Sequence, residues 1–186
     1  MTPRSRAGRC SWLYVWLGAV TFAAIETWPV AAQSKTVPPV AASALQKLLP
    51  AVEGWTAGIA RADLIEISPE AKYSVASQSF TKDDMRIRLT IADTGFSPES
   101  LTALASMIVT MPEDYAGQVG SLAIKRLLIG GSPAVEAWDA QKSAGEVAVV
   151  VGGRFVVAFE APKIDGLATL RTLLDKIDLK ALAALK

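Results

Sequence analysis

The chain has 186 residues, of which 19 are lysine or arginine and 18 are aspartate or glutamate, so its formal net charge is +1. This balance excludes the basic surface that grips a nucleic-acid backbone, and a hydrophobic content of 51% excludes a disordered chain. The sequence contains no histidine and a single cysteine, which excludes histidine-based triads and histidine metal sites. The composition predicts one globular domain with additional N-terminal material.

The N-terminus has the pattern of a bacterial secretory signal. Three arginines precede an uncharged, largely apolar run over residues 12–25, and Val30-Ala31-Ala32 supplies the small residues that a signal peptidase reads. We therefore predict that residues 1–32 are a cleavable signal peptide, cut between Ala32 and Gln33. The mature protein would then be periplasmic or secreted.

The alternative is an uncleaved signal that anchors an extracytoplasmic domain. The uncharged run has 14 residues and ends at Glu26, whereas a spanning helix needs about 20, so we expect no stable membrane span after cleavage. Cleavage would take three of the 19 basic and one of the 18 acidic residues, leaving 16 and 17, and would remove Cys10. A mature chain without cysteine has no disulfide, thiol or zinc–cysteine chemistry.

Residues 33–42 contain Pro38-Pro39 and are predicted to be a flexible tether to a single α+β domain over 43–186. The elements expected in chain order are a short helix from Ser43, strands over 59–67, 73–80 and 85–91, a helix over 98–111, strands over 122–129, 134–140, 147–151 and 154–160, and helices beginning at Asp165 and Asp178. This order predicts an antiparallel sheet of about six to seven strands, covered by helices on both faces.

The glycines of the 147–160 segment predict a hairpin with a two-residue loop, Gly152-Gly153. In that register Val151 faces Arg154 and Val150 faces Phe155. Both faces of the hairpin would then be apolar, which places it in the middle of a sheet that is covered on both sides.

The strand over 85–91 alternates apolar residues with Arg86, Arg88 and Thr90, so both arginines are expected on one polar face. Together with Lys82, and with Lys125 and Arg126 if their strand is a neighbour, they would form a basic patch. Such a patch suits an anionic partner, for example a lipid headgroup or a cell-wall polymer.

Catalytic motifs are weak in this chain. Ser79 and Lys82 match S-x-x-K, but they are expected on a strand and the partner signatures of that enzyme class are missing. The glycines at 130–131 and 152–153 are interpreted as hairpin turns and not as phosphate loops. The remaining acids considered, Asp83, Asp84, Glu113, Asp114, Glu136 and Asp139, are interpreted as solvated charges in turns or on a strand.

The stretches Leu49 to Trp55 (LPAVEGW) and Val150 to Val157 (VVGGRFVV) resemble those of a family of uncharacterised exported bacterial proteins. The order of strands and helices is similar to the helix–sheet–helix sandwich of the PsbP and DcrB type. That resemblance implies an accessory or envelope role and carries no catalytic residue.

These observations lead to the hypothesis of a non-enzymatic envelope module. It would bind an envelope protein or a small ligand through the sheet edge or the basic strand, without nucleic acid, metal or cofactor. The alternative hypothesis is a hydrolase or transferase that uses only carboxylate, serine or lysine chemistry.

Overall fold

The computed structural model describes residues 37–68, 71–95, 107–108 and 110–185, and the predicted signal peptide lies outside this part. The described strands are β1 (Thr56–Ala57), β2 (Arg61–Ser68), β3 (Ala71–Lys82), β4 (Met85–Asp93), β5 (Ala116–Val119), β6 (Leu122–Ile129), β7 (Ser132–Asp139), β8 (Ala144–Val151) and β9 (Phe155–Ala161). The described helices with assigned bounds are α1 (Ala42–Gln46), α3 (Ala168–Leu174) and α4 (Leu179–Ala183).

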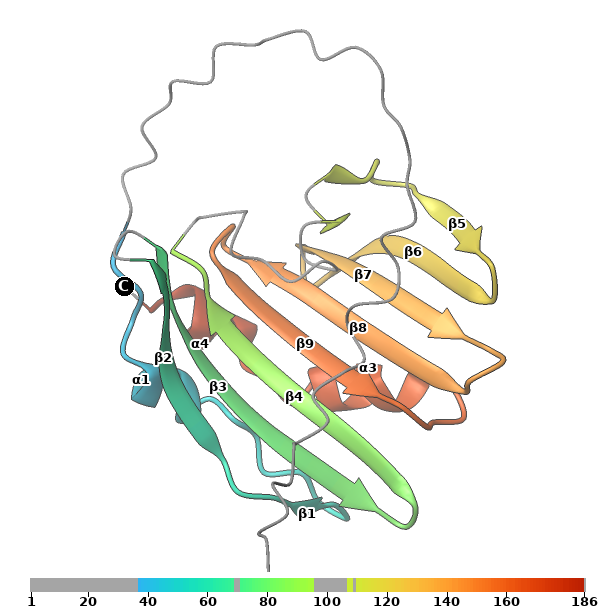
Figure 1. Ribbon diagram of the computed structural model, residues 1–186, viewed down its shortest axis with the longest axis horizontal. Helices are drawn as coiled ribbons and strands as arrows, with labels where there is room; N and C mark the ends of the chain where they lie inside the picture. Colours follow the sequence, from blue (N-terminus) through green and yellow to red (C-terminus); the bar gives the residue numbers. More distant parts are fainter. Residues whose placement is uncertain (1–36, 69–70, 96–106, 109, 186) are drawn as a thin grey trace, which may run out of the picture. The chain divides into compact units, whose positions relative to one another are not determined.

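All nine of these strands form one antiparallel sheet in the order β1-β3-β4-β9-β8-β7-β6-β5, with β2 also pairing with β3 (Figure 1). Two runs of neighbouring strands, β2 to β4 and β5 to β9, meet where β4 pairs with β9. The prediction of an antiparallel sheet is confirmed. The sequence pattern missed β1 and β5, which have two and four residues and are too short for a clear alternation.

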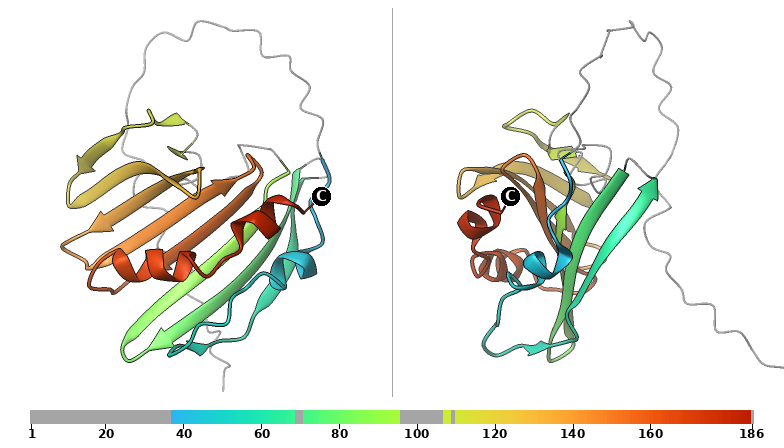
Figure 2. Two further views of the ribbon diagram at one scale, coloured as in Figure 1. Left: turned by 180° about the vertical axis from the view of Figure 1, so that it is seen from behind. Right: turned by 90° about the vertical axis from the view of Figure 1, so that its left-hand side faces the viewer.

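One face of the sheet, which we call the helix face, is covered by α1, α3 and α4 (Figure 2). Its buried side chains include Phe80, Leu89 and Phe159 on three neighbouring strands. These apolar residues recur every second position, so burying them against the helices fixes which face of each strand points inward. The large core on this side provides most of the apolar burial of the described domain.

The opposite face, which we call the arginine face, carries Arg86, Arg88 and a second, smaller core around Val150 and Ala158. Met107, Ile108 and Met111 pack against that core, as expected for gap-filling methionines. Residues 107, 108 and 110 are helical, whereas most of the predicted 98–111 helix lies outside the described residues. Of the described helices with assigned bounds, all three lie on the helix face.

The C-terminal helices differ in one boundary from the prediction. Asp178 caps α4, because its carboxylate accepts a 2.8 Å hydrogen bond from the amide of Ala181, as expected. Asp165 does not cap a helix, since α3 begins only at Ala168 and has no side-chain cap.

The predicted register of the β8–β9 hairpin is wrong by one residue. Gly152 and Gly153 do occupy the turn with positive φ, but Val151 pairs with Phe155 and not with Arg154. Arg154 leaves the ladder because its carbonyl accepts hydrogen bonds from the amide and hydroxyl of Thr94. The slip moves all residues of β9 to the other face relative to β8.

Candidate functional site

The two arginines of β4 lie on the arginine face and are both exposed. Arg86 lies opposite Thr81, and Arg88 lies opposite Ser79, on the neighbouring strand β3. Two residues along an extended strand span about 6.8 Å, so the guanidinium groups can act together on one ligand. This part of the predicted basic patch is therefore formed as a pair of cations beside a row of hydroxyl groups.

Lys82 does not lie with these arginines, because its side chain points to the opposite face of the sheet. It shares the side of β3 that carries Phe80 and so belongs to the helix face. There it lines an open hollow of about 460 Å³ beside Trp55 and Met85, at the tip of the β3–β4 hairpin. Trp55 also packs partly against the main core.

Lys125 and Arg126 do not join the patch either. Their strand, β6, is separated from β4 by β9, β8 and β7, a distance of about 19 Å at the usual strand spacing. Lys125 lies opposite Glu136 on the helix face, and Arg126 donates a hydrogen bond to the carbonyl of Met111 on the other. Because Lys125 and Arg126 also point to opposite faces, the five predicted cations occupy four separate places, and only Arg86 and Arg88 lie together.

A third arginine extends the β4 pair and was missed in the sequence. Arg61 on β2 is exposed and lies opposite Ser77, which in turn lies opposite Thr90 on β4. Arg61 therefore shares the arginine face with Arg86 and Arg88. The signal that could have revealed it is the two-residue alternation with Asp63, which the mixed composition of this strand obscures.

A pair of glutamates on the arginine face was also missed. Glu146 of β8 lies directly opposite Glu160 of β9, where facing Cβ atoms are about 4.5–5.5 Å apart. Burial and the negative charge of Glu160 raise the pKa of Glu146 from its ordinary 4.5 to about 8. Near neutral pH the Glu146 carboxyl is therefore protonated, and the pair carries one negative charge.

The register error explains why this pair was not predicted. A two-residue loop places Glu146 opposite Phe159, on a different row from Glu160, whereas the observed loop aligns the two carboxyl groups. On the other side of β9, Arg88 of β4 lies opposite Glu160, so Glu146, Glu160 and Arg88 form one row across three neighbouring strands. No ion pair joins Arg88 to Glu160 among the residues that the structure describes.

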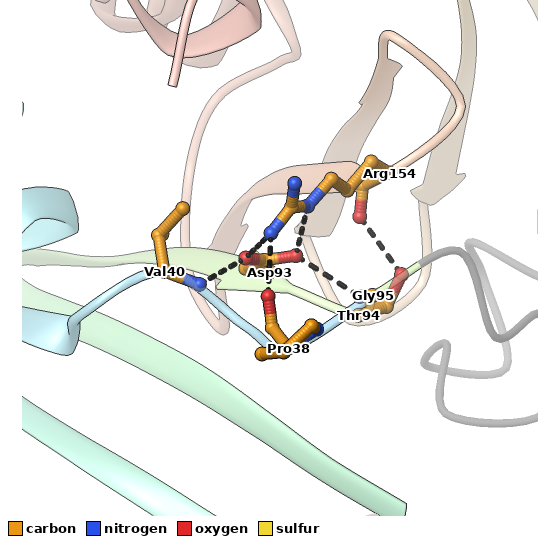
Figure 3. Close-up of polar contacts among 6 residues, drawn as sticks. All are labelled: Pro38, Val40, Asp93, Thr94, Gly95 and Arg154. Atoms are coloured by element: carbon orange, nitrogen blue, oxygen red, sulfur yellow. Dashed lines mark hydrogen bonds and ion pairs between the residues drawn. The ribbon is translucent and has the colours of Figure 1, made fainter. Parts of the chain in front are cut away.

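The other buried charges of the described chain are structural. Asp93 is fully buried, and its carboxylate accepts hydrogen bonds of 2.8 and 2.7 Å from the Nε and Nη2 atoms of Arg154 (Figure 3). The amides of Val40 and Gly95 also donate to it, at 2.6 and 2.9 Å. Arg154 in turn donates to the carbonyl of Pro38 at 3.0 Å. This cluster joins the end of β4, the β8–β9 turn and the segment before α1.

Several of the predicted interpretations can be compared directly with the structure. Glu136 is buried and forms a two-pronged contact with Arg171 of α3, so its interpretation as a solvated charge was wrong. Asp139 is also buried and accepts hydrogen bonds from the amides of Gln141 and Lys142. Ser79 and Lys82 project to opposite faces of β3, which separates the two members of the S-x-x-K pattern.

No family model, curated protein or solved structure gives a match to this chain. In the described residues, no helix is long and apolar enough to cross a membrane, and no group of three or more acidic or cysteine side chains is arranged to hold a metal ion. The resemblance to PsbP- and DcrB-type sandwiches therefore stays a prediction, and we infer a function from the two sheet faces and the charges that they carry.

Proposed function

We propose that this chain is an exported binding module that holds a linear polyanion on the arginine face of its sheet. The observation that carries the proposal is the placement of Arg86 and Arg88, which are exposed on one rigid strand beside the hydroxyl groups of Ser79 and Thr81. Guanidinium groups bind phosphate and carboxylate oxygens through two parallel hydrogen bonds, and nearby hydroxyl groups can add further donors. The predicted signal peptide supports a role in the envelope.

The surroundings of the arginines favour a polymer over a membrane surface. The residues opposite them on β3 are Thr81 and Ser79, and not the large apolar side chains that insert between lipids. Each basic residue near an anionic bilayer contributes only about 1 kcal/mol, so this small group would hold a membrane weakly. A polymer with repeated charges can instead contact Arg86, Arg88 and Arg61 at once.

The first test measures binding of long-chain polyphosphate to the purified protein at several salt concentrations. Replacing Arg86 and Arg88 together with alanine should weaken binding at least tenfold and reduce its salt dependence, because fewer counterions would be released. Lys125→Ala is the matched control, because it removes an exposed cation from the helix face and should change the affinity less than twofold.

Two results would contradict the polyanion proposal. One is a loss of binding free energy in Lys125→Ala that is about half of the loss in the double arginine variant, in proportion to the one and two charges removed, which would indicate a response to net charge alone. The other is binding to phosphatidylglycerol vesicles without any binding to soluble polyphosphate, which would assign the same arginines to a membrane surface.

We further propose that the helix predicted over 98–111 covers the arginine face above its smaller core, so that helices lie on both faces of the sheet. The support is the packing of Met107, Ile108 and Met111 on Val150 and Ala158. The exposed arginines of β4 lie on the strand next to β9, and Arg88 lies opposite Glu160, beyond the Val156 and Ala158 side chains that belong to that core.

A carboxylate hydrolase is the second candidate, because Glu146 and Glu160 place a protonated and an ionised carboxyl side by side. Against it, these acids line neither the hollow of about 440 Å³ beside Ile108 and Val150 nor the hollow of about 460 Å³ beside Trp55 and Met85. This candidate predicts turnover of glycoside or ester substrates that Glu146→Gln abolishes while the fold is retained. A wild-type protein that turns over no substrate in such a panel would eliminate it.

A further inference from the structure

The edge strand β2 presents apolar side chains to solvent and, at Ala62 and Leu64, backbone groups that point away from β3. β2 pairs with β3 along one side, and no strand of the described chain lies along its other side. Leu64 and Ile65 on this strand are 59% and 36% exposed, and Ile59 just before it is 86% exposed. A long edge with this composition is a template for pairing with another strand.

One hydrogen bond determines which residues of β2 direct their backbone N–H and C=O groups away from the sheet. The amide of Gly58 donates to the carbonyl of Ser79 at 2.7 Å, so Ser79 and the alternate residues Ser77 and Val75 direct their backbone groups toward β2. Their partners, Arg61 and Asp63, use their own backbone groups in that ladder. The intervening residues, Ala62 and Leu64, therefore point their N–H and C=O groups away from the sheet.

We infer that β2 binds β2 of a second copy of this chain in an antiparallel pair, with Ala62 on the two-fold axis. In this register Arg61 of each copy lies opposite Asp63 of the partner subunit, so two pairs of opposite charge form on the arginine face. The contact also brings Ile59 beside Ile65 and Ala60 beside Leu64 of the partner subunit, which covers the three exposed apolar side chains.

The charges select this register over its neighbour. Centring the axis on Leu64, the other outward-pointing residue, would place Asp63 opposite Ile65 and Ala62 opposite Glu66 of the partner subunit, with no pair of opposite charge. An axis perpendicular to the sheet keeps each face continuous across the contact, so residues of one face meet residues of the same face. The inferred partner is thus a second copy, and the inference does not rest on the proposed polyanion site, although Arg61 belongs to both surfaces.

The first experiment follows the oligomeric state of the purified protein by sedimentation velocity from about 2 to 200 μM. The wild type should form a dimer as concentration rises, and Ala62→Pro should raise the dissociation constant at least tenfold, because proline removes an outward-pointing N–H. Ala116→Pro is the matched control: Ala116 is exposed on the opposite edge strand, and the hydrogen bond from Arg126 to Tyr115 shows that its amide also points outward. It should leave the dimer unchanged.

The second experiment tests the register by exchanging charges. Arg61→Asp should break the dimer, because two aspartates would then face each other twice, and Arg61→Asp with Asp63→Arg should restore the dissociation constant to within about threefold of the wild type. A wild type that stays monomeric at 200 μM, a dimer insensitive to Ala62→Pro, or a double exchange that fails to restore pairing would each overturn the inference. Ala62→Pro changes no charge and leaves Arg86 and Arg88 in place, so we expect this variant still to bind polyphosphate. The dimer and the polyanion site can therefore fail separately.

Discussion

Replacing Arg154 with alanine is expected to lower the free energy of unfolding by about 3–5 kcal/mol, the usual cost of removing one member of a buried ion pair. The substitution would leave the fully buried Asp93 carboxylate with the hydrogen bonds from the amides of Val40 and Gly95 but without its charged partner. It would also release the carbonyl of Pro38 and the contact of the guanidinium with the Phe155 ring, whose centroid lies at 5.1 Å. Urea unfolding measures the loss.

The matched control for this prediction is Arg86→Ala, which removes an arginine of the same sheet that is exposed and should cost less than about 0.5 kcal/mol. Hydrogen exchange provides a local readout, because the Val40 amide donates to Asp93 at 2.6 Å and should lose protection in Arg154→Ala before the central strands do. A loss below about 1 kcal/mol, or unchanged protection of Val40, would show that the cluster does not hold the segment before α1 to the sheet.

The same arginine shows why part of the fold could not be predicted from local patterns. The alternation in β4 and the Gly152-Gly153 turn were sufficient to predict an antiparallel sheet and the approximate limits of its longer strands. The residue that sets the β8–β9 register is Arg154, whose partners Asp93 and Thr94 are about 60 positions away in the chain. A sequence pattern contains no information about such a contact, so the register favoured by turn statistics was wrong.

The candidate site depends on that register and on strand order. Arg86 and Arg88 were predicted to share a face because both belong to one strand, and this required only the two-residue period. The pairing of Glu146 with Glu160 required the correct hairpin alignment, and the separation of Arg126 from Arg88 required the position of β6 in the sheet. Contacts within one strand were therefore predictable, whereas contacts between strands were not.

On the arginine face, the charge of the β4 arginines is opposed by the two glutamates Glu160 and Glu146. Glu160 lies between Arg88 and Glu146 on one row, so the protonation of Glu146 determines whether one or two negative charges lie beside the arginines. The pKa of about 8 keeps Glu146 neutral near neutral pH, which leaves the cations of β4 less opposed. The proposed anion binding and the stability of the sheet thus depend on the same carboxyl group.

Replacing Glu146 with glutamine is expected to flatten the pH dependence of stability between about pH 4.5 and 8. Because its pKa is raised on folding, from 4.5 to about 8, the folded protein holds a proton that the unfolded chain releases over this range. Stability of the wild type therefore falls as pH rises from about 4.5 to 8, with no further change from this group above that window. Since Glu146 is only partly buried, we expect a loss of about 2 kcal/mol, smaller than the full shift implies.

Urea unfolding of wild type and Glu146→Gln at several pH values measures this effect. The variant should match the wild type near about pH 4, where the carboxyl is protonated in both the folded and the unfolded chain, and exceed it by about 2 kcal/mol at pH 9. Glu113→Gln, at an exposed position, should follow the wild-type curve, and Glu160→Gln should flatten it in part by removing the charge that raises the pKa of Glu146. Parallel curves for wild type and Glu146→Gln would contradict the prediction that Glu146 holds a proton in the folded protein. Both glutamates of the row beside Arg88 would then be ionised at neutral pH.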